Sequence, residues 1–134
     1  MNWDYITGFF DADGSITLSK HHNAPYKTVQ VYFHNNELAL LEEIRDFIEK
    51  ETGIKGVILT KKPAKIEHRT AYDLRYIYFR TANRILKNMP SKHPKKRHRI
   101  SISFELEKLT PRNGKYTEVT LARRLEKEKE FFAH

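Results

Sequence analysis

The sequence contains no cysteine, which excludes disulfide bonds and thiolate metal ligands. No apolar run approaches the roughly 20 residues that a helix needs to cross a bilayer. The N-terminus also lacks a basic segment followed by an apolar run, the pattern of a signal peptide. These absences favour a protein that is not secreted and has no membrane partner, located in the cytoplasm of a prokaryote or in an organelle.

Acidic residues are outnumbered by basic ones, with 17 Asp and Glu against 25 Lys and Arg, so the formal net charge is +8. A positive balance of this size indicates a polyanionic partner, most often nucleic acid, although it can also serve solubility. With 39% hydrophobic and 31% charged residues, the composition is typical of a folded globular protein. We expect residues 1–134 to form a single domain with its own core.

The least ordinary stretch is residues 6–14, an apolar helix that ends in Asp11, Ala12 and Asp13. Carboxylates are unfavourable there because the C-terminal end of a helix carries partial negative charge. A divalent cation is one natural compensation, and Mg²⁺ takes one or two carboxylates together with waters and substrate phosphates. Gly14 follows, at a position where a helix often ends in a left-handed residue.

Periodicity predicts the remaining elements. We expect helices over residues 2–12, 37–51, 81–86 and 117–132, the first capped by Asn2 and the second by Asn35 or Asn36. We expect strands over residues 15–19, 27–33, 56–62 and 71–80. Residues 100–109 fit both a strand and a helix. The order helix, hairpin, helix, hairpin, helix predicts an α+β fold with helices on one face of a sheet.

The predicted hairpin has one apolar and one polar face, because strand residues alternate. The polar face carries Thr17, Ser19, Thr28, Gln30 and Tyr32, short donors and acceptors that can be solvated or can read base edges in a major groove. Residues 91–99 hold five Lys or Arg, which favours phosphate contact or a flexible charged loop.

The segment Ile6-Thr7-Gly8-Phe9-Phe10-Asp11-Ala12-Asp13-Gly14, followed by Ser15-Ile16, resembles the LAGLIDADG homing endonuclease family. The resemblance implies an α-β-β-α-β-β-α fold with a four-stranded antiparallel DNA-binding sheet and extra C-terminal helices. Since the chain holds one copy of the motif, it also implies a homodimer in which two motif helices pack side by side. The interface would contain Tyr5, Gly8 and Ala12, and small residues there permit close approach.

The activity implied by the resemblance is metal-dependent hydrolysis of both strands of a long pseudo-palindromic double-stranded DNA site, with Mg²⁺ or another divalent cation such as Mn²⁺. Asp13 and the backbone carbonyl of Ala12 would bind the metal, and Asp11 would hold the helix end. Asn35 would order water where the family more often has glutamine. Lys96 or Lys95 would approach the site, and spacing does not choose between them; both can equally be phosphate clamps.

On the same resemblance, the sheet lies in the major groove of DNA. By strand parity, its DNA-binding face would carry Thr17, Ser19, His21, Thr28, Gln30, Tyr32, Lys61, Asp73 and Arg75. Arg75 suits a guanine and Gln30 an adenine. An intron-encoded origin is favoured over an intein. An intron RNA-binding maturase and a non-cleaving DNA-binding regulator stay open as alternatives on the same scaffold, although an intact Asp13 favours the nuclease.

Overall fold

The structure, a computed structural model, describes residues 1–20, 24–61, 69–111 and 115–133. Its elements are, in order, α1 (Trp3–Asp13), β1 (Gly14–Lys20), β2 (Lys27–Asn35), α2 (Leu38–Thr52), β3 (Val57–Lys61), β4 (Ala71–Tyr76), α3 (Phe79–Leu86), α4 (Pro94–Leu109) and α5 (Glu118–Phe131). The expected α+β class and helix–hairpin order are confirmed. In this part of the chain, no helix is long and apolar enough to cross a bilayer.

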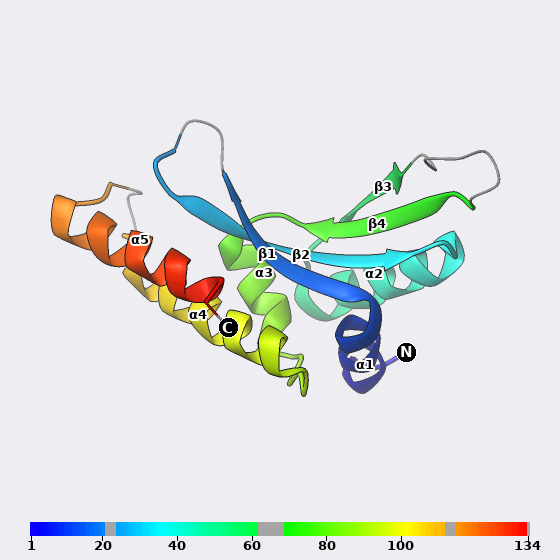
Figure 1. Cartoon of the computed structure of the whole chain (residues 1–134). Helices are drawn as coiled ribbons and strands as arrows, with labels where there is room; N and C mark the ends of the chain where they lie inside the picture. The colour runs from blue at the N-terminus through cyan, green and yellow to red at the C-terminus, as the bar shows by residue number, and fades with distance from the viewer. Residues whose placement is uncertain (21–23, 62–68, 112–114, 134) are drawn as a thin grey trace.

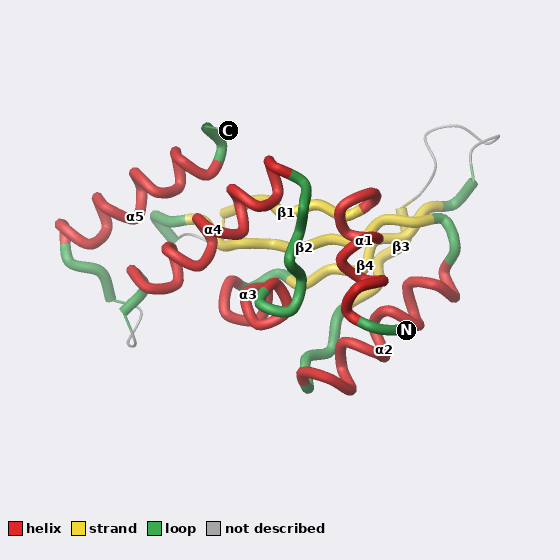
Figure 2. Tube along the Cα trace, turned by 90° about the horizontal axis from the view of Figure 1, so that it is seen from below, coloured by secondary structure: helices red, strands yellow, loops and turns green. Residues whose placement is uncertain are grey.

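The four strands form one antiparallel sheet in the order β1-β2-β4-β3. The two strands of each hairpin pair with each other, and the pairing of β2 with β4 joins the two hairpins at the centre of the sheet. The helices lie on one side of this sheet (Figures 1 and 2), and in the described residues no helix covers the other face. One broad face of the sheet is therefore left for a partner.

The core forms where the apolar face of the sheet meets the helices. The strands contribute their alternate residues Ile16, Leu18, Val29, Val31, Phe33, Leu74 and Tyr76, all buried. Phe33 lies at the centre, with its ring 5.8 Å from Phe10 and 6.3 Å from Tyr76. Such aromatic pairs add about 0.5–1.5 kcal/mol each to the area they bury. This packing fixes α1 on the sheet beside the start of β1.

Gly14 joins α1 to β1 in an extended conformation, with φ −95° and ψ 170°. The expected left-handed helix end was therefore wrong at this residue. Glycine is required for space instead, because a Cβ there would lie 2.8 Å from the carbonyl oxygen of Phe10. The left-handed glycine is Gly53, with φ 75°, which ends α2 by donating its N–H to the Glu49 carbonyl.

Residues 100–109, ambiguous in sequence, belong to the 16-residue helix α4. Pro94 lies in its first turn, where a missing N–H costs nothing. Ile100, Ser103 and Leu106 are buried at a spacing of three, the period of a helix face. The alternation of Ile and Ser therefore does not mark a strand, because the burial follows the helical repeat.

Strand β4 is shorter than the predicted strand over residues 71–80, since it ends at Tyr76 and α3 begins at Phe79. The Phe79 N–H donates to the Thr28 hydroxyl at 3.1 Å. A side chain of β2 thus satisfies one of the free N–H groups at the start of α3. Sequence periodicity did not indicate this contact, because the two residues are far apart in the chain.

The terminal helix α5 is held to the rest of the domain by the fully buried Arg124. Its guanidinium donates to the carbonyls of Leu106 at 3.1 Å and Lys27 at 2.5 Å, and its Nε lies 3.5 Å from Glu128. It also lies 4.9 Å from the centre of the Tyr26 ring. A buried charge is tolerated only when it is paired in this way, so these contacts connect α4, α5 and the hairpin.

Candidate active site and nucleic-acid interface

Helix α1 is buried along one face and bare along the other. The Asn2 side chain accepts a hydrogen bond from the Tyr5 N–H at 2.8 Å, as expected of an N-cap. Tyr5, Gly8 and Ala12 are exposed, and Tyr5 keeps 47% of its surface accessible. A Cβ at Gly8 would meet no atom within 4 Å. Within one chain, nothing in the described residues fills the space beside this helix face.

The C-terminal end of α1 receives a cation from α4. The Lys96 Nζ donates to the carbonyl oxygens of Phe10 at 2.6 Å and Asp11 at 2.8 Å. An ammonium at this position offsets the negative end of the helix. Burial lowers the pKa of Lys96, while the nearby carboxylates of Asp11 and Asp13 oppose that shift.

The structure gives different surroundings to Lys95 and Lys96, between which sequence spacing did not choose. Lys96 contacts the end of the motif helix, whereas Lys95 is exposed. Successive residues of a helix point about 100° apart, so two neighbours rarely reach the same site.

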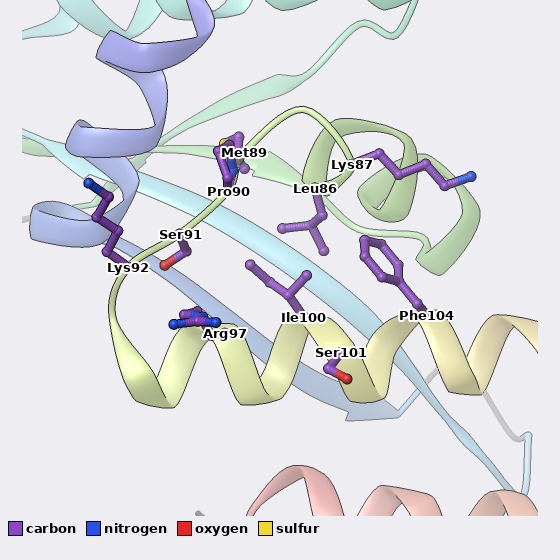
Figure 3. A pocket seen from close by; sticks show the side chains of 10 residues that line it. All are labelled: Leu86, Lys87, Met89, Pro90, Ser91, Lys92, Arg97, Ile100, Ser101 and Phe104. Carbon is purple, nitrogen blue, oxygen red and sulfur yellow. The ribbon is translucent and has the colours of Figure 1, made fainter.

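The two acidic residues of the motif have different surroundings. The Asp11 carboxylate accepts hydrogen bonds from the Ser91 hydroxyl and, at 3.0 Å, from the Lys92 N–H. Ser91 and Lys92 lie in the connection between α3 and α4, beside α1 (Figure 3). Asp11 therefore ties this connection to the helix. Asp13 is exposed at the last position of α1, directly before β1.

Asn35 lies at the end of β2, and its side chain accepts a hydrogen bond from the Glu37 N–H at 2.8 Å. It shapes the turn into α2, whose N-cap is Glu37.

At the end of β2, the residue before Asn35 is His34, which lies on the uncovered face of the sheet with Ser15 and Asp73. Its ring lies 3.1 Å from the Ser15 hydroxyl and 2.5 Å from the Asp73 carboxylate. The predicted strand over residues 27–33 ends two residues before the end of β2, so His34 was not predicted on this face; the alternation that includes Tyr32 was the available signal.

The uncovered sheet face holds a cluster around Arg75. The Arg75 guanidinium lies 5.1 Å above the Tyr32 ring and 3.3 Å from the Asp73 carboxylate. The Tyr32 hydroxyl donates to the side-chain oxygen of Gln30. Lys61 reaches the same carboxylate of Asp73 from β3, at 3.3 Å. The strand pairing of Tyr32 with Arg75 brings these side chains together.

Two residues expected at the DNA surface are buried, each 2% exposed. Thr28 uses its hydroxyl to accept from Phe79, and Asp73 lies beneath His34, Lys61 and Arg75. In the protein without DNA, Thr28 and Asp73 are therefore not available for the direct contacts expected of them, because each side chain has its partners inside the protein. His21 lies outside the described residues. Thr17, Ser19, Gln30, Tyr32, Lys61 and Arg75 remain partly or fully accessible.

Comparison with known families settles the relationship. The LAGLIDADG-like domain family matches residues 3–90, well over half of the sequence. The chain belongs to the LAGLIDADG family. Comparison with curated proteins gives no significant match.

Solved structures of the LAGLIDADG family share the fold. The archaeal intron-encoded homing endonuclease I-Vdi141I is 19% identical with a TM-score of 0.69, and the match covers 97% of this chain and 81% of that one. The homing endonuclease I-CvuI is 15% identical with a TM-score of 0.69, covering 96% and 78%. The meganuclease I-AabMI is 20% identical with a TM-score of 0.68; the match covers 96% of this chain but spans only 44% of that protein.

The end of the LAGLIDADG helix has donors that suit a hard cation. Among the described residues, no group of three or more His, Cys, Asp and Glu side chains comes together, so one chain offers no complete cage. It offers the Asp13 carboxylate, with the Ala12 carbonyl beside it in the chain. This set fits Mg²⁺, which retains waters and binds substrate phosphates, better than a cation that needs many protein ligands.

The folding stability of this LAGLIDADG domain depends on pH through Asp73. Burial alone would raise the pKa of its carboxyl group, but the hydrogen bond and charge of His34, followed by hydrogen bonds from Lys61 and Arg75, hold the pKa below its ordinary value. A carboxyl group with a lowered pKa in the folded state stabilises the protein above its unfolded-state pKa. That contribution disappears as the pH falls through the folded-state value.

We expect Asp73→Asn to lower the free energy of unfolding by about 2 kcal/mol at pH 7, since it removes the buried charge that pairs with Lys61 and Arg75 and contacts His34. The difference between wild type and variant should shrink as the pH falls below about 4, where the unfolded carboxyl becomes protonated. Urea unfolding at pH 7, 5 and 3 measures this. Asp46→Asn is the control, because the Asp46 side chain is 67% exposed. A difference that is equal at all three pH values would contradict the role given to Asp73.

Proposed function

We propose that this protein is a homing endonuclease that hydrolyses both strands of a long pseudo-palindromic DNA site, acting as a homodimer with Mg²⁺ or Mn²⁺. The observation that carries the proposal is the exposed Asp13 at the end of α1, directly before β1, with the Lys96 ammonium on carbonyls of the same helix end. These two groups would supply an acidic metal ligand and a cation at the end of the polar sheet face. A phosphodiester within a bound duplex has its natural position there.

The relatives support the class of substrate. I-AabMI was solved bound to uncleaved DNA, and I-Vdi141I was solved with DNA and is intron-encoded. I-CvuI was solved with a DNA target in the presence of Mg. We propose the same substrate, a divalent cation and an intron-encoded origin for this chain. The net charge of +8 suits the polyanion.

Asp13 would hold the metal ion through its carboxylate, and the Ala12 carbonyl would complete the protein ligands. When bound, a divalent cation polarises the scissile phosphate and lowers the pKa of a water molecule. Lys96 has three N–H donors and uses two of them on the carbonyls of Phe10 and Asp11. The third is free to donate to a phosphate oxygen, where it would stabilise the charge that develops during hydrolysis.

The number of metal-binding carboxylates in one chain is the reason for proposing a homodimer. One chain has one exposed Asp13, and cutting two strands at one target needs two such groups. The bare face of α1, with Tyr5, Gly8 and Ala12, allows a second α1 to approach closely. Side-by-side packing of two α1 helices would place both Asp13 residues near the two-fold axis. Bound cations would then offset the repulsion between the carboxylates.

Asp13→Asn should reduce DNA cleavage by at least about a thousandfold and leave DNA affinity within a fewfold of wild type, because the amide is a poor metal ligand while the side chains of the sheet face are unchanged. Cleavage is measured in Mg²⁺ on a target selected from a duplex library, and affinity on the same target in Ca²⁺. Asp46→Asn should cut normally. If Asp13→Asn cut at the wild-type rate, Asp13 would not be the metal ligand.

Lys96→Met should slow cleavage on the order of a hundredfold, since it removes a positioned donor while keeping the apolar stem. Lys95→Met is the matched control and should cut within about threefold of wild type. Single-turnover rates at saturating protein separate this effect from affinity. Equal losses in the two variants would show that both lysines act as phosphate clamps.

Gly8→Val should weaken self-association by at least about tenfold, because the added side chain occupies the space that a second helix needs. The monomer should remain folded, since a Cβ at Gly8 meets no neighbour within 4 Å. Sedimentation velocity measures the association and circular dichroism the folding. Ala39→Val, on an exposed position of α2, is the control. A wild-type protein that stays monomeric with and without DNA would overturn the homodimer.

A further inference from the structure

The uncovered sheet face carries two large apolar side chains that the core does not use. Val57 is 56% exposed and Leu59 is 40% exposed, both on the edge strand β3. Ile58, between them, packs against the core, as the alternation of a strand requires. Exposed apolar side chains on an edge strand favour aggregation unless a partner covers them. Their presence among polar residues therefore calls for an occupant.

The strand register places these side chains beside the Arg75 cluster. Val57 pairs directly with Arg75, and Leu59 pairs with Asp73. Side chains of directly paired residues have Cβ atoms about 5 Å apart and lie on the same face. Arg75 in turn pairs with Tyr32, so one row across the sheet runs from an aromatic ring to a guanidinium to an isopropyl group.

Arg75 is held in place rather than free to move. Asp73, itself buried, accepts from its guanidinium at 3.3 Å, and the Tyr32 ring lies 5.1 Å below. A guanidinium fixed in this way presents its remaining N–H donors in one direction. That arrangement suits the two acceptors of a guanine in the major groove.

We propose that Val57 and Leu59 recognise the C5-methyl groups of thymines next to a guanine bound by Arg75. This inference rests on the proposed DNA-binding function of the sheet. Phosphates are charged and the major-groove edges of the bases carry hydrogen-bond donors and acceptors, whereas the C5-methyl of thymine is the apolar substituent on that surface. Neighbouring base pairs are about 3.4 Å apart along the duplex axis. The Cβ atoms of directly paired residues are about 5 Å apart, so Val57 and Arg75 together span one to two base-pair steps.

The consequence is a target whose half-site contains a guanine with adjacent thymines, read by methyl contacts as well as by hydrogen bonds. Lys61, at the far end of the same strand and 51% exposed, lies near enough to bind a flanking phosphate. The edge strand would then contact DNA in two ways. Lys61 would bind a phosphate, and Val57 and Leu59 would contact thymine methyl groups without hydrogen bonds.

The test begins with target selection from a random duplex library in Ca²⁺, with the full-length wild-type protein. Each thymine of the selected half-site is then replaced by deoxyuridine, which lacks only the methyl group. We expect affinity to fall roughly fourfold at the positions that β3 contacts, the value of one buried methyl group. Equal affinity for thymine and deoxyuridine at every position would overturn the inference.

Val57→Ser is the decisive variant, because serine removes both γ-methyl groups of valine, whereas threonine would keep one that can contact a thymine methyl. It should remove the difference between thymine and deoxyuridine at one position and leave the others unchanged. Val119→Ser, at a position of α5 that is 65% exposed, is the matched control and should behave as wild type.

Other outcomes separate the two proposals. Failure of the wild-type protein to bind any duplex would overturn the proposed function itself. Binding with no effect of the methyl groups would overturn only the inference. Self-association that Val57→Ser abolishes in the absence of DNA would also overturn it, since β3 would then be a protein interface.

Discussion

The contact between the Lys96 ammonium and the last carbonyls of α1 is the interaction on which the site depends. A helix that ends in two aspartates has negative charge added to its negative end. The cation that offsets this charge comes from α4, more than 80 residues along the chain. The N-terminal motif is therefore incomplete until α4, whose Ile100 and Leu106 are buried in the common core, has packed in the domain and brought Lys96 to the end of α1.

The carboxylates of the domain show how charge is divided between structure and activity. The Asp11 carboxylate is hydrogen-bonded to the connection before α4, and Asp73 is enclosed by His34, Lys61 and Arg75. Asp11 is half-buried and Asp73 is buried, and both carboxylates have fixed partners within the protein. Asp13 has kept its access to solvent, which leaves it available to a metal ion and a phosphate. Aspartate thus stabilises the fold where it has partners within the protein and remains available to a ligand where it is exposed.

The uncovered face of the sheet combines features that a solvated surface does not need. Its arginine is buttressed by a buried acid and an aromatic ring, and its edge strand exposes two branched apolar side chains. Holding Arg75 in one orientation reduces the entropy that binding would otherwise cost. Together these features describe a surface prepared for a partner with both polar and apolar edges.

Local pattern was enough to predict much of this protein. Alternation in Val29, Val31 and Phe33 identified the buried face of the sheet, and the motif around Asp13 identified the first helix and the family. These predictions succeeded because strand alternation and helix ends are decided by residues close together in sequence. The charge balance likewise indicated a polyanionic partner without reference to any fold.

Contacts between distant segments decided the rest. The packing of α4 made residues 100–109 a helix and directed Lys96, rather than Lys95, to the end of α1. The burial of Thr28 depends on Phe79, and that of Asp73 on His34, which lies on another strand. Parity states which face a side chain occupies but not what covers it. By itself, the sequence determined the motif, the strands and the sign of the charge; only the tertiary structure decided which polar groups stay free, because burial depends on segments far apart in the chain.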